Sequence, residues 1–253
     1  MSTIKAAVQA QFGSVAEQYR TSAVHASGAD LERIAALVGE RPAPEVLDVG
    51  CGGGHVTTAV AAVSRSVVAC DLTPAMLAQV ERLATERGLS NVRTQQADVE
   101  QLPFADASFD VVLSRYSAHH WPHPQQGLNE CLRVLRPGGL LLFSDIVAPE
   151  EPALDTFLQV IEYLRDRSHV RDYRVSEWLT MFTTAGVVAE SIMAWALPLG
   201  FEAWVARIAT PAPQVAMLRQ IFDSAPAEVR SAFAIDIGYD FAIPGALFQA
   251  VKA

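Results

Sequence analysis

Three aspartates stand at or near the ends of three successive apolar segments in the first half of the chain. Asp48 lies in EVLDVG, Asp71 ends SVVACD, and Asp98 lies near the end of NVRTQQADV. Carboxylates at adjacent strand ends can accept hydrogen bonds from the hydroxyl and amino groups of a nucleoside. They also favour a ligand that carries positive charge over a phosphorylated one. Each acid taken alone could equally be a solvated loop residue or a helix cap.

A glycine-rich turn, GCGGGH, follows the first of these segments. Gly50 and Gly52 fit the first two positions of the dinucleotide pattern G-x-G-x-x-G, but the third position is His55. The turn contains no Lys or Arg, and Asp48 beside it would repel a pyrophosphate. S-adenosylmethionine has no phosphate and carries an ammonium and a sulfonium, so it fits these acids better. Asp71 can accept both ribose hydroxyls, a feature that NAD-binding proteins share. A tight turn that binds no ligand remains the alternative.

Alternating strands and helices must position these residues. The pattern predicts strands at 45–50, 66–71, 91–99, 109–117 and 140–147, and helices at 5–20, 29–38, 55–65, 74–87 and 125–135. Strand, helix and strand at this spacing predict an α/β fold with a parallel sheet, which binds ligands at the carboxyl ends of its strands. Beyond residue 148 we expect a helix at 149–167, a helix capped by Ser176, a strand within 187–196, further helices and a last strand near 240–251.

The overall composition limits the partners and the compartment. The chain has 253 residues, 51% of them hydrophobic, and a net charge of −9 without a basic block. This disfavours binding to nucleic acid, and no apolar run is long enough to span a membrane. Three widely spaced cysteines and the absence of a signal-peptide pattern favour a cytoplasmic protein. A homodimer is left open.

Four segments occur in an order and at a spacing that resemble a known family: VLDVGCGGGHVT, VVACDLTPAML, ADVEQLPFADASFDVVLSRYSAHH and LRPGGLLLFSD. Together they resemble class I S-adenosylmethionine-dependent methyltransferases, in particular the ubiquinone/menaquinone C-methyltransferase-like group, over about residues 45–147. The resemblance implies a Rossmann-like, seven-stranded, mostly parallel sheet with an antiparallel last strand and helices on both faces. The sequence departs from the family's usual pattern at the third consecutive glycine and in RYSAHHW, so the resemblance does not identify the substrate.

The resemblance also implies roles for residues around the cofactor. It places Asp48, Gly50 and Gly52 at the methionine part, Asp71 and Leu72 at the ribose, Asp98 and Val99 at the adenine, and the backbone near Ser114 and Arg115 at the methionine amino group. The chain would then be a single methyltransferase domain over residues 1–253. Within it we expect an N-terminal helical lid (1–40), a cofactor-binding core (41–147), and substrate-side helices with a C-terminal helical insertion and the closing strands (148–253).

Candidate catalytic groups follow from the chemistry of methyl transfer. The transfer is an in-line displacement, so positioning does much of the work and a base is needed only if the acceptor loses a proton. His120 is our preferred candidate, with His119 and Tyr19 as further ones. Each could instead be a packed or capping side chain. No metal is expected, because two adjacent histidines seldom reach one ion.

Three further residues are candidates for binding the substrate. These are His25, Arg171 and Trp178. Arg171 could clamp an anionic group, although a solvated helix end is the simpler interpretation. The aromatic residues of the last third predict mainly core packing, with some lining an apolar pocket.

The sequence therefore predicts an enzyme that transfers a methyl group from S-adenosylmethionine to a carbon, nitrogen or oxygen atom of a small molecule. The acceptor is expected to be an aromatic or heterocyclic metabolite. It would be either a secondary metabolite that the enzyme modifies or a quinone-like compound. The alternatives are a non-catalytic S-adenosylmethionine-binding regulator and, less favoured, an NAD-dependent oxidoreductase.

Overall fold

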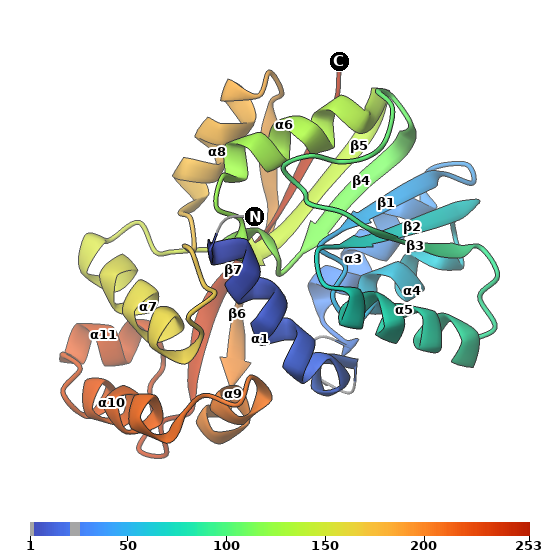
Figure 1. The fold of residues 1–253 in the computed structure, drawn as a ribbon. Helices are drawn as coiled ribbons and strands as arrows, with labels where there is room; N and C mark the ends of the chain where they lie inside the picture. The colour runs from blue at the N-terminus through green and yellow to red at the C-terminus, as the bar shows by residue number, and fades with distance from the viewer. Residues whose placement is uncertain (1–2, 21–25) are drawn as a thin grey trace.

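A seven-stranded sheet organises the computed structural model, which describes residues 3–20 and 26–253, with the backbone alone at residues 3 and 18–20 (Figure 1). The strand order is β3-β2-β1-β4-β5-β7-β6. The strands are β1 (Glu45–Val49), β2 (Ser66–Asp71), β3 (Val92–Gln96), β4 (Phe109–Arg115), β5 (Leu135–Ile146), β6 (Ala189–Leu199) and β7 (Phe241–Val251). β1 to β5 are parallel, whereas β7 runs antiparallel to both of its neighbours. This confirms the predicted fold class.

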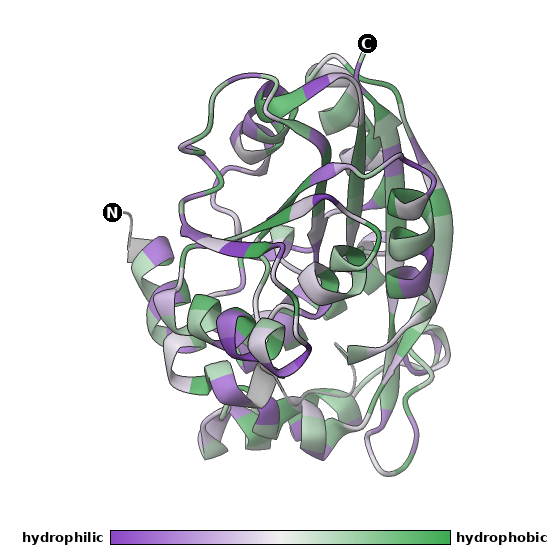
Figure 2. Cartoon of the chain, turned by 90° about the vertical axis from the view of Figure 1, so that its right-hand side faces the viewer, coloured by the Kyte–Doolittle hydropathy of each residue, from purple (hydrophilic) through white to green (hydrophobic). Residues whose placement is uncertain are grey.

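Helices cover both faces of the sheet because its strands are buried on both sides, as apolar runs in parallel sheets usually are. One face packs against α3 (Ala29–Gly39), α4 (His55–Ala61) and α5 (Pro74–Glu86), and the other packs against α6 (Pro124–Val134) and α8 (Val175–Thr184). Figure 2 shows the hydrophobic strands between these helices. Of the described helices, none is both long and apolar enough to cross a lipid bilayer.

The C-terminal helices form a separate cluster beyond one end of the sheet (Figure 1). They are α7 (Pro152–Arg165), α9 (Phe201–Arg207), α10 (Ala212–Asp223) and α11 (Ala227–Ala232). The last three are inserted between β6 and β7, where the sequence predicts helices. Trp204, Phe222 and Phe241 pack at the centre of this cluster with ring centroids about 5 Å apart. The cluster therefore forms a wall at the end of the sheet where the central strands carry the candidate residues.

The N-terminal helix α1 (Thr3–Arg20) lies across this end of the sheet. Phe12 and neighbouring apolar residues pack on Met76 of α5. The side-chain amide of Gln9 donates to the carbonyl oxygen of Leu72 at 2.8 Å, and that of Gln11 donates to the carbonyl oxygen of Ile208 at 2.8 Å. Because these bonds reach the sheet on one side and the C-terminal cluster on the other, α1 has the position of a lid.

Three local expectations need correction. β5 begins at Leu135, so the RPGG segment lies within the strand rather than before it, and Leu135 pairs with Phe109. α8 begins at Val175 after Arg174, and Ser176 donates its hydroxyl to Glu150 instead of capping the helix. β3 ends at Gln96, so Asp98 lies in the loop beyond the strand.

Candidate active site

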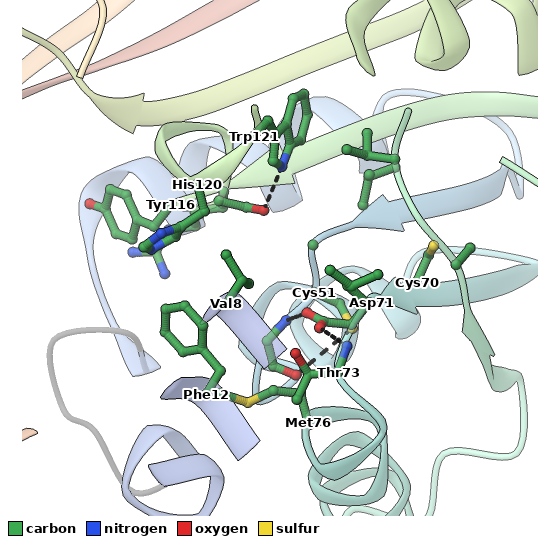
Figure 3. Close-up of a pocket in the computed structure, with 18 of the residues that line it drawn as sticks. Val8, Phe12, Cys51, Cys70, Asp71, Thr73, Met76, Tyr116, His120 and Trp121 are labelled. Atoms are coloured by element: carbon green, nitrogen blue, oxygen red, sulfur yellow. Dashed lines mark hydrogen bonds between the residues drawn. The ribbon is translucent and has the colours of Figure 1, made fainter. Parts of the chain in front are cut away.

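A cavity lies at the carboxyl ends of β1, β2 and β4, under α1 (Figure 3). Its volume is about 130 Å³, roughly ten times the space that one bound water molecule needs on this scale. In Figure 3, Asp71 and Thr73 lie at one end and Tyr116, His120 and Trp121 at the other, with Val8 and Phe12 of α1 between them. The ring of Phe12 packs on that of His120, with centroids 4.8 Å apart. The position agrees with the rule that parallel sheets bind ligands at the ends of their central strands.

Asp71 is the acid that the structure places most directly at this cavity. Its Oδ2 accepts the backbone N–H of Gly52 at 3.0 Å, and its Oδ1 accepts that of Thr73 at 2.8 Å. Burial raises the pKa of Asp71, and these backbone donors oppose the rise. A carboxylate has about four acceptor positions, so two remain for a pair of ligand hydroxyls.

The glycine-rich turn directs its amide groups into the protein. The backbone N–H groups of Gly50 and Cys51 both donate to the carbonyl oxygen of Cys70, at 2.8 and 3.0 Å, and that of Gly52 donates to Asp71. A phosphate site needs several such groups aimed at the ligand. The amides of Gly50, Cys51 and Gly52 are therefore already occupied within the protein, which leaves the first half of the turn without donors for a pyrophosphate.

Two of these glycines have a positive φ for different reasons. Gly50 has φ +67°, and an added Cβ would lie 1.8 Å from the hydroxyl oxygen of Ser117. Gly52 has φ +51°, and an added Cβ would meet nothing within 4 Å. Because Gly52 lines the cavity, the space beside it is available to a ligand.

Asp98 lies at the opposite side of the cavity from the residues of β4, together with Val99 and Leu72. Lys5 of α1 reaches both Asp98, at 2.6 Å, and Glu100, at 2.5 Å. The position of Asp98 is compatible with the predicted contact to adenine. The structure adds that Lys5 links α1 to this same carboxylate, which the sequence did not indicate.

The side chains of Asp48 and Ser114 do not line the cavity, and the contacts that the resemblance implies for Asp48 and for the backbone near Ser114 stay predictions. Asp48 is 1% exposed, lies behind the turn, and accepts the hydroxyl of Thr57 at 2.5 Å. Burial raises its pKa to about 7. Ser114 is buried as well, and neither side chain lines the cavity. The reason is that both side chains belong to the buried interior of the sheet.

A second cavity adjoins the first on the side of the C-terminal helices. Its volume is about 70 Å³. Phe12, Tyr116 and His120 border both cavities. The remaining residues come from η1 (Ala118–His120), the end of β5, α7 and the loop after it, and β6, α9 and β7: His119, Ile146, Glu162, Arg165, Asp166, His169, Asp172, Leu197, Leu199, Trp204, Arg207 and Ile243.

His120 lies at the junction as a neutral imidazole. Its Nδ1 is 3.1 Å from the backbone carbonyl oxygen of Ser168, which can only accept, so Nδ1 donates and Nε2 carries the lone pair. Burial and the neighbouring charge of His119 lower the pKa of His120 to about 4. His120 is therefore unprotonated at neutral pH, but a pKa this low makes it a weak base, which can take a proton only from a hydroxyl that becomes more acidic as the methyl group is transferred.

His119 differs from its neighbour because it faces an acid. Its Nδ1 is 2.6 Å from Oδ1 of Asp145, whose Oδ2 accepts the backbone N–H of Ala118 at 2.8 Å. Burial lowers the pKa of His119, but the Asp145 carboxylate outweighs it and raises the pKa to about 9. A cationic imidazole thus lies beside a neutral one, with ring centroids 4.3 Å apart.

The other predicted site residues are not brought to these cavities. Arg171 pairs with Asp155 at 3.0 Å, and Trp178 is 1% exposed and packs against Phe143 and Phe182 in the core. Neither lines the two cavities, so the structure gives no support to their predicted contact with substrate. The side chain of Tyr19 and the whole of His25 lie outside the described residues. Within the described residues, no group of three His, Cys, Asp or Glu side chains is arranged to hold a metal ion.

Comparison with known proteins identifies the family. A family model described as a methyltransferase domain matches residues 47–143. The chain is 35% identical over 246 residues to the uncharacterized methyltransferase YcgJ of Bacillus subtilis, covering 95% of this chain and 97% of YcgJ. The crystal structure of YcgJ superimposes with a TM-score of 0.83 over 87% of this chain and 98% of that one. The chain belongs to the methyltransferase family.

Two further relatives extend this comparison. The methyltransferase is 44% identical to the uncharacterized protein YafE of Escherichia coli over 186 residues, which cover 74% of this chain and 90% of YafE. It is 37% identical to the ubiquinone/menaquinone biosynthesis C-methyltransferase UbiE of Ectopseudomonas mendocina over 122 residues, 47% of this chain and 48% of UbiE. These matches confirm the predicted resemblance.

The enzyme is an S-adenosylmethionine-dependent methyltransferase, and the first cavity fits this cofactor. Asp71 has acceptor positions for hydroxyls, Gly52 leaves room, and the inward-facing amides disfavour a dinucleotide. The NAD-dependent oxidoreductase considered from the sequence is thereby set aside. When bound, S-adenosylmethionine supplies a methyl group on a sulfonium.

Proposed function

We propose that the second cavity holds the methyl acceptor, a small ring-containing metabolite that is methylated at oxygen or at a carbon activated by an ionised oxygen. The observation that carries this proposal is the position of His120, which borders the cofactor cavity and the second cavity with an unprotonated Nε2. A methyl group passing from one cavity to the other would cross this junction.

The two histidines would divide the work on the acceptor. His120 would take the proton of an enol or phenol hydroxyl on its Nε2. The cationic His119, held by Asp145, would stabilise the negative charge that remains on the acceptor oxygen. The same positive charge would disfavour an ammonium acceptor, which is why we favour oxygen-based nucleophiles over amines.

The apolar part of the second cavity's lining, which lies beside charged residues such as Glu162, Arg165 and Arg207, supports a ring-containing acceptor. Phe12, Tyr116 and Trp204 provide aromatic surfaces, and Leu197 and Ile243 provide aliphatic ones. Small-molecule sites are mostly apolar with a few polar groups that fix orientation. UbiE, a relative named as a C-methyltransferase of quinone biosynthesis, fits a ring-containing acceptor.

The proposal is tested by measuring release of S-adenosylhomocysteine with a panel of enols, phenols, carboxylates and amines. We expect turnover with an enol or phenol. His120→Ala should lower kcat for that acceptor by about 10² to 10⁴, as loss of a general base does, while the Kd for S-adenosylmethionine changes less than threefold. His123→Ala is the matched control, because His123 is exposed and lines neither cavity.

Two results would contradict the proposal. Turnover confined to amines would refute the assignment of the nucleophile. An unaltered kcat in His120→Ala would remove the proposed base. If S-adenosylmethionine binds but no acceptor in a metabolite extract releases S-adenosylhomocysteine, the non-catalytic regulator becomes the better interpretation.

A further inference from the structure

Asp172 lines the second cavity and differs from the other buried aspartates of the described chain in how its carboxyl group is bonded. It lies in the loop between α7 and α8 and is 1% exposed. Its backbone is held in place, because the N–H donates to Oε1 of Gln159 at 3.1 Å and the carbonyl oxygen accepts from Nε2 of the same side chain at 2.7 Å. Its Oδ2 has no hydrogen-bond partner among the residues that the structure describes.

The other buried aspartates in the described ranges all have donors on their carboxyl groups. Asp30 accepts from Arg115, Asp48 from Thr57, Asp145 from the backbone N–H of Ala118, Asp155 from Arg171 and Arg174, and Asp166 from Ser168. For Asp172, Nε2 of His169 lies 3.6 Å from Oδ2, which is too long for a hydrogen bond. Nearly all buried polar atoms in proteins are paired, so an unpaired carboxyl oxygen on a residue that lines a cavity indicates a partner supplied by a ligand.

His169 places this carboxyl group close to the proposed reaction centre. The centroid of its ring lies 6.3 Å from that of His120 and 5.7 Å from that of His119. Burial lowers the pKa of His169 to about 2, so its ring is neutral and gives Asp172 no counter-charge. Because His120 and Asp172 border one small cavity and lie on the same imidazole, a single ring-sized molecule can reach both.

A hydroxyl is the ligand group that suits this carboxyl group best. Burial raises the pKa of Asp172, while the positive charge of His119 opposes the rise. An ionised carboxyl group only accepts hydrogen bonds, whereas a protonated one both donates and accepts. A hydroxyl pairs with either form, but a carbonyl oxygen pairs only with the protonated form. An ammonium group pairs well only with the ionised form and would be repelled by the cationic His119 in the same cavity.

We infer that Asp172 is a specificity-determining residue whose carboxyl group binds a second hydroxyl of the methyl acceptor, one that the enzyme does not methylate. The inference rests on the proposed function, since it takes the second cavity as the acceptor site. It narrows the acceptor to a ring with two hydroxyls, of which one faces His120 and the other faces Asp172. Such a site rejects an analogue that lacks the second hydroxyl, because the carboxyl group then stays buried without a partner.

The inference is tested by calorimetric titration of the enzyme with bound S-adenosylhomocysteine. The probes are phenol and the dihydroxybenzenes catechol, resorcinol and hydroquinone, in the absence of oxygen. At least one dihydroxybenzene should bind wild type about 10- to 100-fold more tightly than phenol, as expected for a hydrogen bond to a carboxyl group. Asp172→Leu, an apolar substitution of similar shape, should bind that dihydroxybenzene and phenol with nearly equal dissociation constants.

Further measurements separate recognition from folding. Asp172→Leu should unfold at the same or a higher urea concentration than wild type, because it removes an unpaired polar group from a buried position. Asp172→Asn keeps an acceptor oxygen and should retain part of the preference for the second hydroxyl. Asp106→Leu is the matched control and should leave every dissociation constant unchanged, because Asp106 is exposed and lines neither cavity.

His120→Ala distinguishes this inference from the proposed function. It should lose turnover but keep the preference in Kd, because Asp172 acts in binding and not in proton transfer. If a dihydroxybenzene binds through Asp172 but neither it nor any other ring is methylated, the proposed function fails while the hydroxyl contact stands.

Three outcomes would overturn the inference. The first is that no dihydroxybenzene binds wild type more tightly than phenol, as would be the case if only water pairs with the carboxyl group. The second is that the preference persists in Asp172→Leu. The third is that the Asp172 variants weaken phenol and the dihydroxybenzenes by the same factor, which would indicate a structural role.

Discussion

The His119–Asp145 pair should make the stability of this methyltransferase depend on pH. The pKa of His119 rises from 6.5 to about 9 in the folded protein. At about 1.4 kcal/mol per pH unit, this corresponds to roughly 3 kcal/mol, an upper bound because the His119 side chain is 16% exposed. The folded state binds this proton more tightly than the unfolded state. The stabilisation is therefore complete below about pH 6.5 and is lost as the pH rises through about 9.

The assay is urea unfolding of wild type and His119→Gln at pH 6 and at pH 10. Taking the difference between the two proteins removes the contribution of other titrating groups, such as Asp48, whose pKa is raised to about 7. The stability difference should be about 3 kcal/mol smaller at pH 10 than at pH 6. Asp145→Asn should reproduce the loss of pH dependence. A difference between wild type and His119→Gln that is the same at both pH values would refute the reasoning.

Three other predictions concern the turn, the ribose contact and the core. Asp71→Asn should weaken S-adenosylmethionine binding by about 1–3 kcal/mol in calorimetric titration, and an unchanged Kd would contradict the ribose assignment. Gly50→Ala should lower both unfolding free energy and cofactor affinity, because its Cβ would collide with Ser117. Gly88→Ala, at a similar φ of +66° but in open space, should cost only the backbone strain of about 1–2 kcal/mol and spare cofactor binding. Trp178→Ala should lower the unfolding free energy by about 3–5 kcal/mol in urea without changing the cofactor Kd, since Trp178 is a core residue.

The sheet and its cofactor end could be predicted because they depend on local patterns and one topological rule. Short apolar runs indicate buried parallel strands, and the carboxyl ends of such strands converge. Asp71, Asp98 and the glycine-rich turn all lie at this end of the sheet and line the cavity. The burial of Asp48 could not be predicted in the same way, because a strand pattern that is apolar on both faces does not say which side chain reaches a ligand.

The residues that the sequence did not reveal come from distant segments. Lys5 and Phe12 reach the cavity only because α1 folds across it, and Asp30 reaches Arg115 across 85 positions. No periodicity specifies such contacts. The ion pair of Arg171 with Asp155 could not be predicted for a related reason, because a charged segment does not show whether its charges pair with one another or face a ligand.

The direction of the backbone amides, more than the number of acids, distinguishes this turn from a phosphate-binding one. The sequence offers three carboxylates, but Asp48 is buried in the structure and Asp98 pairs with Lys5. Asp71 is the acid that best explains nucleoside binding, because it faces the cavity and accepts the N–H of Gly52. The carbonyl oxygen of Cys70 accepts the N–H groups of Gly50 and Cys51. A pyrophosphate would meet the Asp71 carboxylate, which repels it, whereas a ribose meets the same carboxylate as a hydrogen-bond acceptor. The spacing of the glycines does not predict this difference, because the same residues could direct their N–H groups either into the protein or toward the ligand.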